Sequence, residues 1–208
     1  MPYHKTQQWN YNLQNKDKIR KGMLAKRRAI TAGEYSAAGL SAKQLLAAHP
    51  LFQASQHIAC YFGQEDEFDC APIIEEICLL GKFCYLPVLS SLQKKSLAFV
   101  NYHPGDPLRL NRYHIFEPES GDRLAPDRLD LVIVPLVAFD TKGHRVGMGG
   151  GYYDRTFAFK RGVNKPYLLG LGYELQKVAE VPADSWDVLL DGVLTEKIIY
   201  QISASRPL

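Results

Sequence analysis

A glycine-rich stretch that directly follows an apolar run constrains the fold of this chain most. Residues 145–155 read Arg-Val-Gly-Met-Gly-Gly-Gly-Tyr-Tyr-Asp-Arg, and four glycines lie within five positions: Gly147, Gly149, Gly150 and Gly151. The run 129–138 predicts a buried strand, and residues 152–160 predict a helix. A strand, a glycine loop and a helix N-terminus favour an anion site, because backbone N–H groups are exposed and no Cβ blocks a phosphate.

The loop matches neither common nucleotide-binding motif. No Gly-Lys-Ser/Thr closes it, as a Walker A loop requires, and Tyr152 stands where the third glycine of G-x-G-x-x-G would be. A flexible connection is the alternative interpretation. Turns rarely need four glycines, however, whereas close backbone approach to a ligand does. The sequence therefore predicts a phosphate cradle of a different type.

Length and composition indicate one cytoplasmic domain. The 208 residues, 46% of them hydrophobic, can bury a substantial core. No apolar run approaches the roughly 18 residues of a membrane span, and the N-terminus lacks the apolar core of a signal peptide. Four cysteines without a C-x-x-C pair favour buried reduced thiols over a metal cluster: Cys60, Cys70, Cys78 and Cys84.

Positive charge is concentrated at the N-terminal end. Residues 1–30 carry eight Lys/Arg against Asp17 alone, a net charge of +7, and the remaining 17 positive against 21 negative residues leave a net of −4. Residues 1–15 are polar and aperiodic, which predicts a mobile extension before a single domain over 16–208. A helix is expected from about Lys16. Lys16 and Arg20 would share one of its faces, either as a solvated basic surface or as a clamp for a triphosphate.

The rest of the chain alternates between expected strands and helices. A capping box at Thr31-Ala-Gly-Glu34 opens a helix that ends near residue 49, and residues 71–80 form another. Strands are expected at 57–62, 82–88, 96–102, 129–137, 167–172 and 187–195, and residues 103–128 are expected to be largely loop. This order predicts a three-layer α/β/α sandwich on a largely parallel sheet. The acidic loop 64–69 and the glycine loop should face one crevice at the carboxyl ends of the strands.

Several polar residues near this crevice have two interpretations. Asp154 could hold Mg²⁺ against phosphates. Asp191 is a candidate second carboxylate or a turn residue before Gly192. Tyr152 and Tyr153 are either core aromatics or a platform for a flat heterocycle. Glu67 could accept a hydrogen bond from a ring N–H, although a solvated loop acid is the simpler interpretation.

Four separated motifs resemble the 5-formyltetrahydrofolate cyclo-ligases. They are Lys16-Asp-Lys-Ile-Arg20, Tyr61-Phe-Gly-Gln-Glu-Asp-Glu67, the run 129–140 followed by 143–155, and Asp191-Gly-Val-Leu-Thr195. The resemblance is colinear from Lys16 to Glu196. It implies a fold similar to the NagB/RpiA/CoA-transferase group. It also implies ATP- and Mg²⁺-dependent conversion of 5-formyltetrahydrofolate, which can be polyglutamylated, to 5,10-methenyltetrahydrofolate with release of ADP and phosphate.

The same resemblance implies the roles of individual residues. The catalytic residues would be Arg145, Tyr152 and Asp154. ATP would be bound by Lys16, Arg20, Arg145, Gly147, Met148, Gly149, Gly150, Gly151, Tyr152 and Tyr153. The folate would be bound by Phe62, Glu67, Gly149, Gly150, Gly151 and Tyr152, and Mg²⁺ by Asp154 and Asp191. Some members of the family have a lysine among the glycines; here Met148, Gly149 and Gly150 leave that cation missing, so Arg145 or Arg155 is expected to compensate.

Two other functions are compatible with parts of the sequence. A sugar-phosphate isomerase or CoA-transferase could use a related sheet but would not need ATP. A nucleic-acid-binding module could use the basic residues 16–28, with steeply salt-dependent binding. We expect instead a cytoplasmic, monomeric enzyme that binds neither nucleic acid nor membranes.

Overall fold

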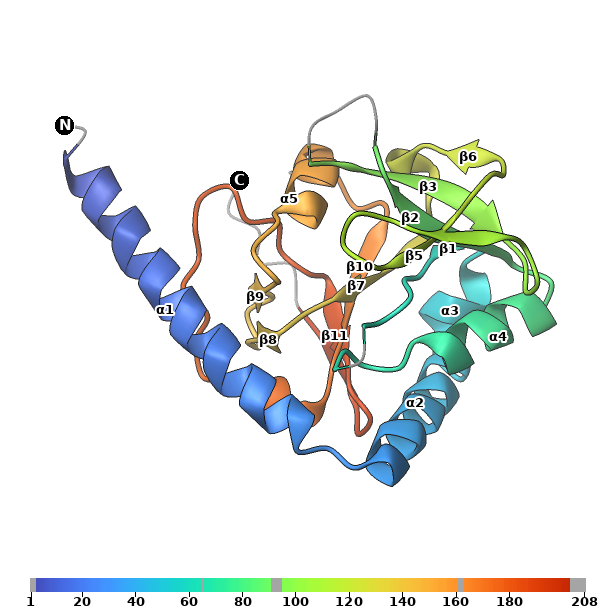
Figure 1. Cartoon of the computed structure of the whole chain (residues 1–208), viewed down its shortest axis with the longest axis horizontal. Coiled ribbons are helices and arrows are strands. Elements are labelled where there is room, and N and C mark those ends of the chain that lie inside the picture. Colours follow the sequence, from blue (N-terminus) through green and yellow to red (C-terminus); the bar gives the residue numbers. More distant parts are fainter. Residues whose placement is uncertain (1–2, 65, 91–94, 161–162, 203–208) are drawn as a thin grey trace.

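A computed structural model of the chain describes residues 3–64, 66–90, 95–160 and 163–202 (Figure 1). The α-helices are α1 (Tyr3–Arg28), α2 (Ala32–Ala47), α3 (Pro50–Ala54), α4 (Ala71–Leu79) and α5 (Tyr152–Thr156). Short 3₁₀ helices are η1 (Pro126–Arg128), η2 (Ala158–Lys160) and η3 (Glu174–Gln176). The strands are β1 (His57–Ala59), β2 (Phe83–Leu89), β3 (Leu97–Tyr102), β4 (Leu108–Leu110), β5 (Phe116–Pro118), β6 (Arg123–Leu124), β7 (Leu131–Pro135), β8 (Ala138–Phe139), β9 (Arg145–Val146), β10 (Tyr167–Leu171), β11 (Gly192–Leu194) and β12 (Ile199–Gln201).

Eight of these strands form one mixed sheet in the order β12-β11-β10-β7-β1-β2-β3-β6. The central pairs β11–β10, β10–β7, β7–β1 and β1–β2 are parallel. At the two ends of the sheet, β12, β3 and β6 pair antiparallel with their neighbours. The unit β1–α4–β2 pairs in parallel, as its sequence predicted. The expectation of a largely parallel sheet is therefore confirmed.

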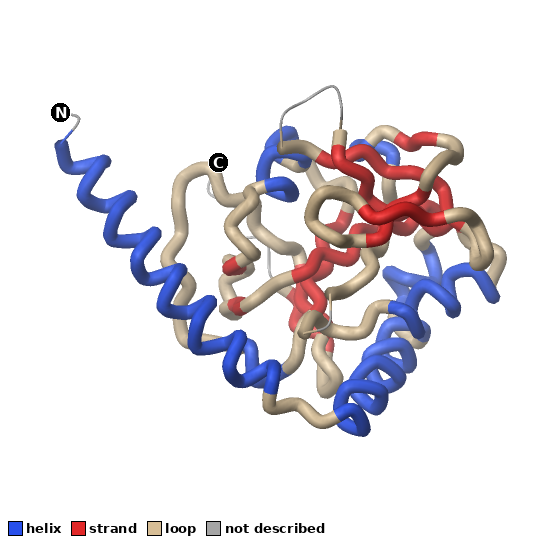
Figure 2. The backbone as a smooth tube through the Cα atoms, in the orientation of Figure 1, coloured by secondary structure: helices blue, strands red, loops and turns tan. Residues whose placement is uncertain are grey.

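Strand β7 requires cover on both faces of the sheet. Leu131 and Ile133 lie in a core built with α2, α3 and α4, whereas Val132 and Val134 lie in a second core that includes Phe157, directly after α5. All four strand side chains are fully buried. Because side chains alternate across a strand, a strand buried along its whole length needs layers on both sides. Figure 2 shows the strands in the centre, with α2–α4 on one side and α1 on the other, which agrees with the predicted layered architecture.

Helix α1 begins well before the predicted start at Lys16. It runs from Tyr3, so the expected irregular extension over residues 1–15 is wrong for the part that is helical. Its buried residues are spaced by four, seven and four positions: Asn12, Lys16, Met23 and Arg27. Three of the four are polar or charged and find partners on the body of the protein. An apolar periodicity is absent for that reason, and the sequence pattern missed the first turns of the helix.

Residues 103–128 contain more structure than the loop that was predicted. Strands β4 and β5 pair as an antiparallel hairpin, with Leu108 opposite Pro118 and Leu110 opposite Phe116. Asn111 stabilises the turn, since its Oδ1 accepts hydrogen bonds from the backbone N–H of Tyr113 at 2.8 Å and of residue 115 at 3.3 Å. Strands β6 and β12 were also missed. Strands of two or three residues are too short to give a recognisable alternation of side chains.

The helix ends that the sequence marked are confirmed. Glu34 N–H donates to Thr31 Oγ1, and Thr31 N–H donates to Glu34 Oε2, which completes the capping box of α2. Helix α4 stops before Gly81, whose φ of +67° lies in the left-handed region. No helix within the described ranges is long and apolar enough to cross a membrane. The four cysteines are free thiols.

Candidate active site

A cavity of about 630 Å³ opens beyond the carboxyl ends of β1 and β7. Tyr61 and Phe62, which follow β1, line it together with Pro135 and Leu136 at the end of β7. Glu67 of the acidic loop and residues 147–151 of the glycine loop lie in its wall as well. The prediction that these two loops face one crevice is confirmed. Parallel strands place their carboxyl ends at the same edge, and this explains why distant segments meet there.

Gly149, Gly150 and Gly151 of the glycine loop occupy positions that disfavour larger residues. Gly149 and Gly151 have φ values of +93° and +65°, which L side chains rarely adopt. A Cβ on Gly150 would lie 2.7 Å from the ring of Tyr152. Helix α5 is only five residues long, shorter than the helix predicted over 152–160, so its dipole is a minor contribution. The positive charge at this loop must come from side chains.

Two arginines hold the glycine loop from opposite ends. Arg20 Nε donates to the carbonyl oxygen of Gly147 at 2.8 Å. The Arg155 guanidinium donates to the carbonyl oxygen of Gly150 and, through Nε, to Lys95 O at 3.2 Å. Of the two candidates for the missing loop cation, Arg155 is therefore the one in contact with the glycines. Its motif position pointed to it, but only the fold places its side chain against the loop.

Arg145 is committed to a different task. Its guanidinium donates to Asp154 Oδ1 at 2.7 Å and to Val188 O at 2.5 Å, and its side chain is 6% exposed. The N–H of Val188 donates to the same Asp154 oxygen at 3.2 Å. Within the described ranges, the other carboxylate oxygen of Asp154 accepts no hydrogen bond. Asp154 lines the cavity, so this oxygen is available to a ligand there.

The prediction of a two-carboxylate metal site requires Asp191 to line the cavity. The structure does not place it there. Its Oδ2 lies 2.7 Å from Nζ of Lys160, whose side chain is 1% exposed, and accepts a hydrogen bond from Leu168 N–H at 2.8 Å. A buried ammonium needs a counter-charge, and Asp191 supplies it. The described residues also contain no cluster of three or more His, Cys, Asp and Glu side chains with metal-binding geometry.

Lys16 lies in the cavity wall with two acidic neighbours that were not predicted. Its Nζ donates to Asp184 at 2.8 Å and to Asp187 at 2.7 Å, and Asn12 Nδ2 donates to the other oxygen of Asp184 at 3.0 Å. Burial acts to lower the pKa of Lys16, but the two carboxylates outweigh it and hold this pKa above its ordinary value. Lys16 therefore stays charged. Its separation of about 170 residues from these partners left no local sequence signal.

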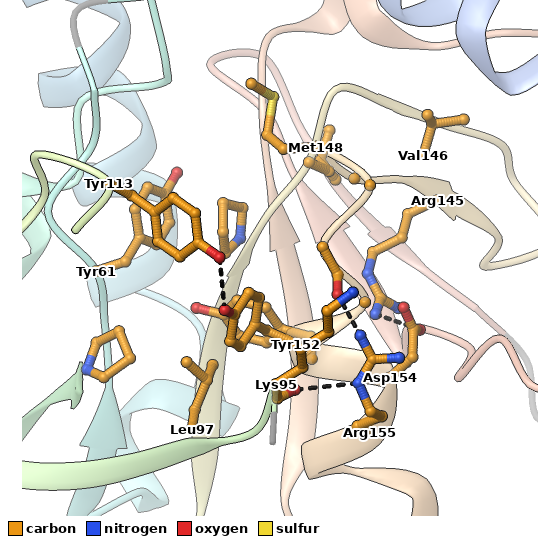
Figure 3. Close-up of a pocket in the computed structure, with 18 of the residues that line it drawn as sticks. Tyr61, Lys95, Leu97, Tyr113, Arg145, Val146, Met148, Tyr152, Asp154 and Arg155 are labelled. Carbon is orange, nitrogen blue, oxygen red and sulfur yellow. Dashed lines mark hydrogen bonds and ion pairs between the residues drawn. The ribbon is translucent and has the colours of Figure 1, made fainter. Parts of the chain in front are cut away.

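Tyr152 meets residues of the β4–β5 hairpin across the cavity (Figure 3). Its hydroxyl lies 2.8 Å from that of Tyr113 and accepts a hydrogen bond from Arg112 at 2.7 Å. Burial acts to raise the pKa of Tyr152, but these bonds outweigh it and lower the pKa below its usual value. Asn111, Tyr113, Ile115 and Phe116 line the cavity. They belong to the region 103–128 that was expected to be largely loop, and the sequence did not assign them to the site.

Glu67 and Phe62 lie on the wall formed by the acidic loop. Glu67 Oε2 accepts a hydrogen bond from Gln64 N–H at 3.1 Å. Burial raises the pKa of Glu67, against the lowering effect of that hydrogen bond and of Arg27. Glu67 is half-buried in this wall, which is less exposure than a fully solvated loop acid would have. The ring of Phe62 packs edge-on against Tyr102, with 5.5 Å between ring centroids.

The predicted aromatic pair divides between two roles. Tyr152 reaches across the cavity, whereas Tyr153 packs into the core against Phe157, with 6.2 Å between ring centroids, and only borders the cavity. Burial raises the pKa of Tyr153 far above its usual range. Tyr153 is therefore mainly a core residue.

Large apolar side chains remain exposed at the Lys16 end of the cavity. Leu13, Met148 and Trp186 all line it and are 41%, 59% and 51% exposed. Leu13 precedes Lys16 by one turn of α1, and Trp186 stands between the two aspartates that bind Lys16. Such exposure is costly for a tryptophan unless a partner covers it. Sequence reasoning identified Met148 alone among the three.

Comparisons with known proteins agree on one family. A model of the 5-formyltetrahydrofolate cyclo-ligase family matches residues 12–196. The chain is 36% identical over 179 residues to the 5-formyltetrahydrofolate cyclo-ligase of Escherichia coli (strain K12), which covers 85% of this chain and 97% of that protein. The chain is also 36% identical over 190 residues to the Haemophilus influenzae protein of the same name; the match covers 88% of this chain and 98% of that protein.

A solved structure has the same fold. The NMR structure of Aquifex aeolicus 5,10-methenyltetrahydrofolate synthetase superimposes with a TM-score of 0.78 at 30% identity. The superposition covers 93% of this chain and 95% of that one.

Proposed function

Since the chain belongs to the 5-formyltetrahydrofolate cyclo-ligase family, we propose that its 630 Å³ cavity binds ATP and 5-formyltetrahydrofolate side by side and converts the folate to 5,10-methenyltetrahydrofolate. The observation that carries this proposal is the composition of the cavity. One end has cations around a glycine loop, and the other has aromatic rings around the half-buried carboxyl group of Glu67. A charged nucleotide and a flat pterin need these two environments.

The glycine-loop end is suited to the phosphates and base of ATP. Arg20 and Arg155 contact a loop in which four of five residues, 147–151, have no Cβ, and Lys16 lines the same cavity, an arrangement suited to polyphosphate recognition. Trp186 and Met148 offer an apolar surface on which a nucleobase can stack. Asp184 and Asp187 neutralise Lys16 in the structure. We propose that they orient its ammonium group, and that Arg20 and Arg155 supply most of the phosphate contacts.

The hairpin end is suited to the pterin. Tyr113 and Tyr152 present aromatic faces, with their rings at 80° and 6.0 Å between centroids, and Phe62 borders the same space. When ionised, Glu67 accepts hydrogen bonds only, which matches the N–H donors along one edge of a pterin. Tyr152 follows the glycine loop and also touches the hairpin. We therefore place the junction of the two substrates beside it.

Asp154 fits a magnesium ion, whereas Asp191 does not. Mg²⁺ takes one or two carboxylates and fills the rest of its octahedral shell with phosphate oxygens and water. Asp154 lies in the cavity with one oxygen available, held in place by Arg145, so we propose it as the protein ligand. Bound there, the ion would neutralise phosphate charge. Asp191 is outside the cavity lining and balances Lys160.

The reaction that we propose needs positioning and charge neutralisation more than a protein nucleophile. The formyl oxygen attacks the γ-phosphorus and ADP leaves. N10 then attacks the activated formyl carbon and closes the five-membered ring; its N–H proton is released to solvent and phosphate departs. Arg20 and Arg155 would stabilise the charge that develops on the transferred group. The Arg112–Tyr152 hydrogen bond would keep the Tyr152 hydroxyl fixed at the junction.

Three cations of α1 are engaged within the protein: Lys16 with Asp184 and Asp187, Arg20 with Gly147, and Arg27 with Asp66. Lys18, Lys21, Lys26 and Arg28 are exposed. A measurement of salt-dependent binding to RNA or DNA therefore separates the nucleic-acid alternative from the cyclo-ligase. We propose a single cyclo-ligase domain over residues 16–208 that acts as a cytoplasmic monomer; its first helix, α1, begins ahead of the domain at Tyr3.

One reaction tests the proposal directly. Purified protein is mixed with 5-formyltetrahydrofolate, ATP and Mg²⁺, and the absorbance of the methenyl product is followed together with release of ADP. We expect one ADP for each methenyltetrahydrofolate, and no product when ATP or Mg²⁺ is left out. Product formation without ATP would refute the phosphoryl-transfer mechanism. Full activity in the presence of a chelator would remove Asp154 from a metal site.

A further inference from the structure

The last turn of α1 contains a buried arginine that does not reach the cavity. Arg27 is 3% exposed, and its guanidinium nitrogen lies 3.0 Å from Oδ2 of Asp66. Within the described ranges, Arg27 Nε has no hydrogen-bond partner and Asp66 Oδ2 has no partner besides this ion pair. An arginine buried for packing alone would be replaced by an apolar residue at little cost, since desolvation of both charges is expensive. We therefore ask whether the Arg27–Asp66 ion pair fixes the conformation of the acidic loop 64–69, which contains Asp66.

Asp66 is the residue directly before Glu67, and the two side chains diverge. Glu67 lines the cavity, whereas Asp66 borders a separate small hollow with Arg27, Tyr35 and Tyr173. The backbone turns here, since Glu67 N–H donates to Gln64 O at 2.8 Å. Arg27 thus holds the outer side of the same turn whose inner side presents Glu67. A shift of the Asp66 carboxylate would move Glu67 with it.

The charges around Glu67 make the same pair important for its ionisation. Burial raises the pKa of Glu67 and neighbouring Asp66 raises it further, while Gln64 N–H and Arg27 lower it. The other titratable groups that face it among the described residues are the phenols of Tyr35, Tyr61 and Tyr153, which are neutral at physiological pH. Arg27 is therefore the cation that offsets Asp66 beside the half-buried carboxylate of Glu67.

We propose that Arg27 is a positioning residue for the folate, which acts through Asp66 to hold Glu67 against the pterin. The inference rests on the proposed contact between Glu67 and the substrate. It gives α1 a second task, because Lys16, Arg20 and Arg27 follow one another along the same face of this helix. One rigid element then sets both the phosphate end and the pterin end of the cavity.

The test compares Arg27→Met with Arg28→Met as a matched control. Arg28 is the next residue, is exposed, and loses the same charge in the same helical turn. For Arg27→Met we expect the KM for 5-formyltetrahydrofolate to rise by about tenfold or more, the usual scale for misplacing a binding group through its support. The KM for ATP should stay unchanged, since Lys16 and Arg20 lie up to three turns away. Arg28→Met should leave both constants unchanged.

The pH profile separates positioning from a general loss of stability. With Arg27 removed and Asp66 left charged, Glu67 is protonated at higher pH, so the acid limb of kcat/KM for the folate should move upward. Arg27→Lys should restore much of the profile, because it keeps the charge. A double-mutant cycle with Asp66→Asn should be strongly non-additive, as both changes remove one ion pair. Additive effects, or equal increases in the KM for folate and for ATP, would overturn the proposal.

Glu67→Gln distinguishes failure of this inference from failure of the premise. If this variant raises the KM for the folate and Arg27→Met does not, Glu67 contacts the substrate and Arg27 does not position it. If Glu67→Gln leaves the KM unchanged, the proposed pterin contact itself is wrong, and the role of Arg27 falls with it. Thermal unfolding of each variant shows that the kinetic measurements refer to folded protein.

Discussion

Replacing Asp191 by asparagine should destabilise the protein without weakening nucleotide binding. The carboxylate lies 2.7 Å from Lys160 Nζ, whose side chain is 1% exposed. At an effective dielectric constant of about 20, two unit charges at this distance attract by roughly 6 kcal/mol, part of which is offset by desolvation. Removing one partner from a buried pair costs about 3–5 kcal/mol, because the remaining charge stays buried. For a chain of this length that corresponds to a fall in Tm of about 6–20 °C.

The assay combines thermal unfolding with the KM for MgATP of the same samples. Asp127→Asn is the matched control, since Asp127 is exposed, and it should leave Tm unchanged. Lys160→Met should also destabilise the fold, and the double variant Asp191→Asn/Lys160→Met should recover part of the loss, because no unpaired charge is then left. An Asp191→Asn protein with an unchanged Tm and a strongly raised KM for MgATP would refute the reasoning. That result would indicate that Asp191 is a metal ligand and not the counter-ion of Lys160.

Three other outcomes test the cavity. Asp154→Asn should lose most turnover while staying folded, as measured by kcat over a Mg²⁺ titration and by thermal unfolding; an unchanged Mg²⁺ dependence would exclude the assigned role. Trp186→Ala should raise the KM for ATP by about 5- to 100-fold, the scale of losing one base–aromatic stack of about 1–3 kcal/mol. In a Trp9→Phe background, ATP should quench the fluorescence of Trp186, and no quenching would contradict stacking. Because burial raises the pKa of Glu67, folate binding should decline as pH falls at a higher pH than an ordinary glutamate would give, and Glu67→Gln should remove this limb.

Much of the fold was readable from local patterns. The capping box at Thr31, the glycine after α4 and the fully apolar run of β7 each depend on neighbours in sequence, so they predicted two helix ends and a buried central strand. The alternation of strands with helices then left a parallel sheet as the natural arrangement. The exceptions are instructive. Helix α1 is anchored through Asn12 and Lys16 to residues 183–187, far along the chain, and the two strands of the β4–β5 hairpin have only three residues each.

The sequence also marked several of the residues that meet at the site, but not how they are used. The spacing within residues 145–155 and between Lys16 and Arg20 marked the phosphate end, and Glu67 marked the other. The tertiary structure decided the pairing of charges. Asp191 is placed against Lys160, Lys16 between two aspartates, and Arg155 against the glycine loop.

The physical reason for this division is range. Backbone conformation and side-chain periodicity are set by residues a few positions apart, which a sequence displays directly. The energy of a charge depends instead on burial and on the ions within a few ångströms of it. Here those ions lie about 170 residues along the chain for Lys16 and 31 residues along the chain for Lys160. The sequence therefore identified the glycine loop, Asp154 and Asp191 as candidate site residues. Only the folded structure distinguished a candidate metal ligand, Asp154, from a counter-ion of a buried lysine, Asp191.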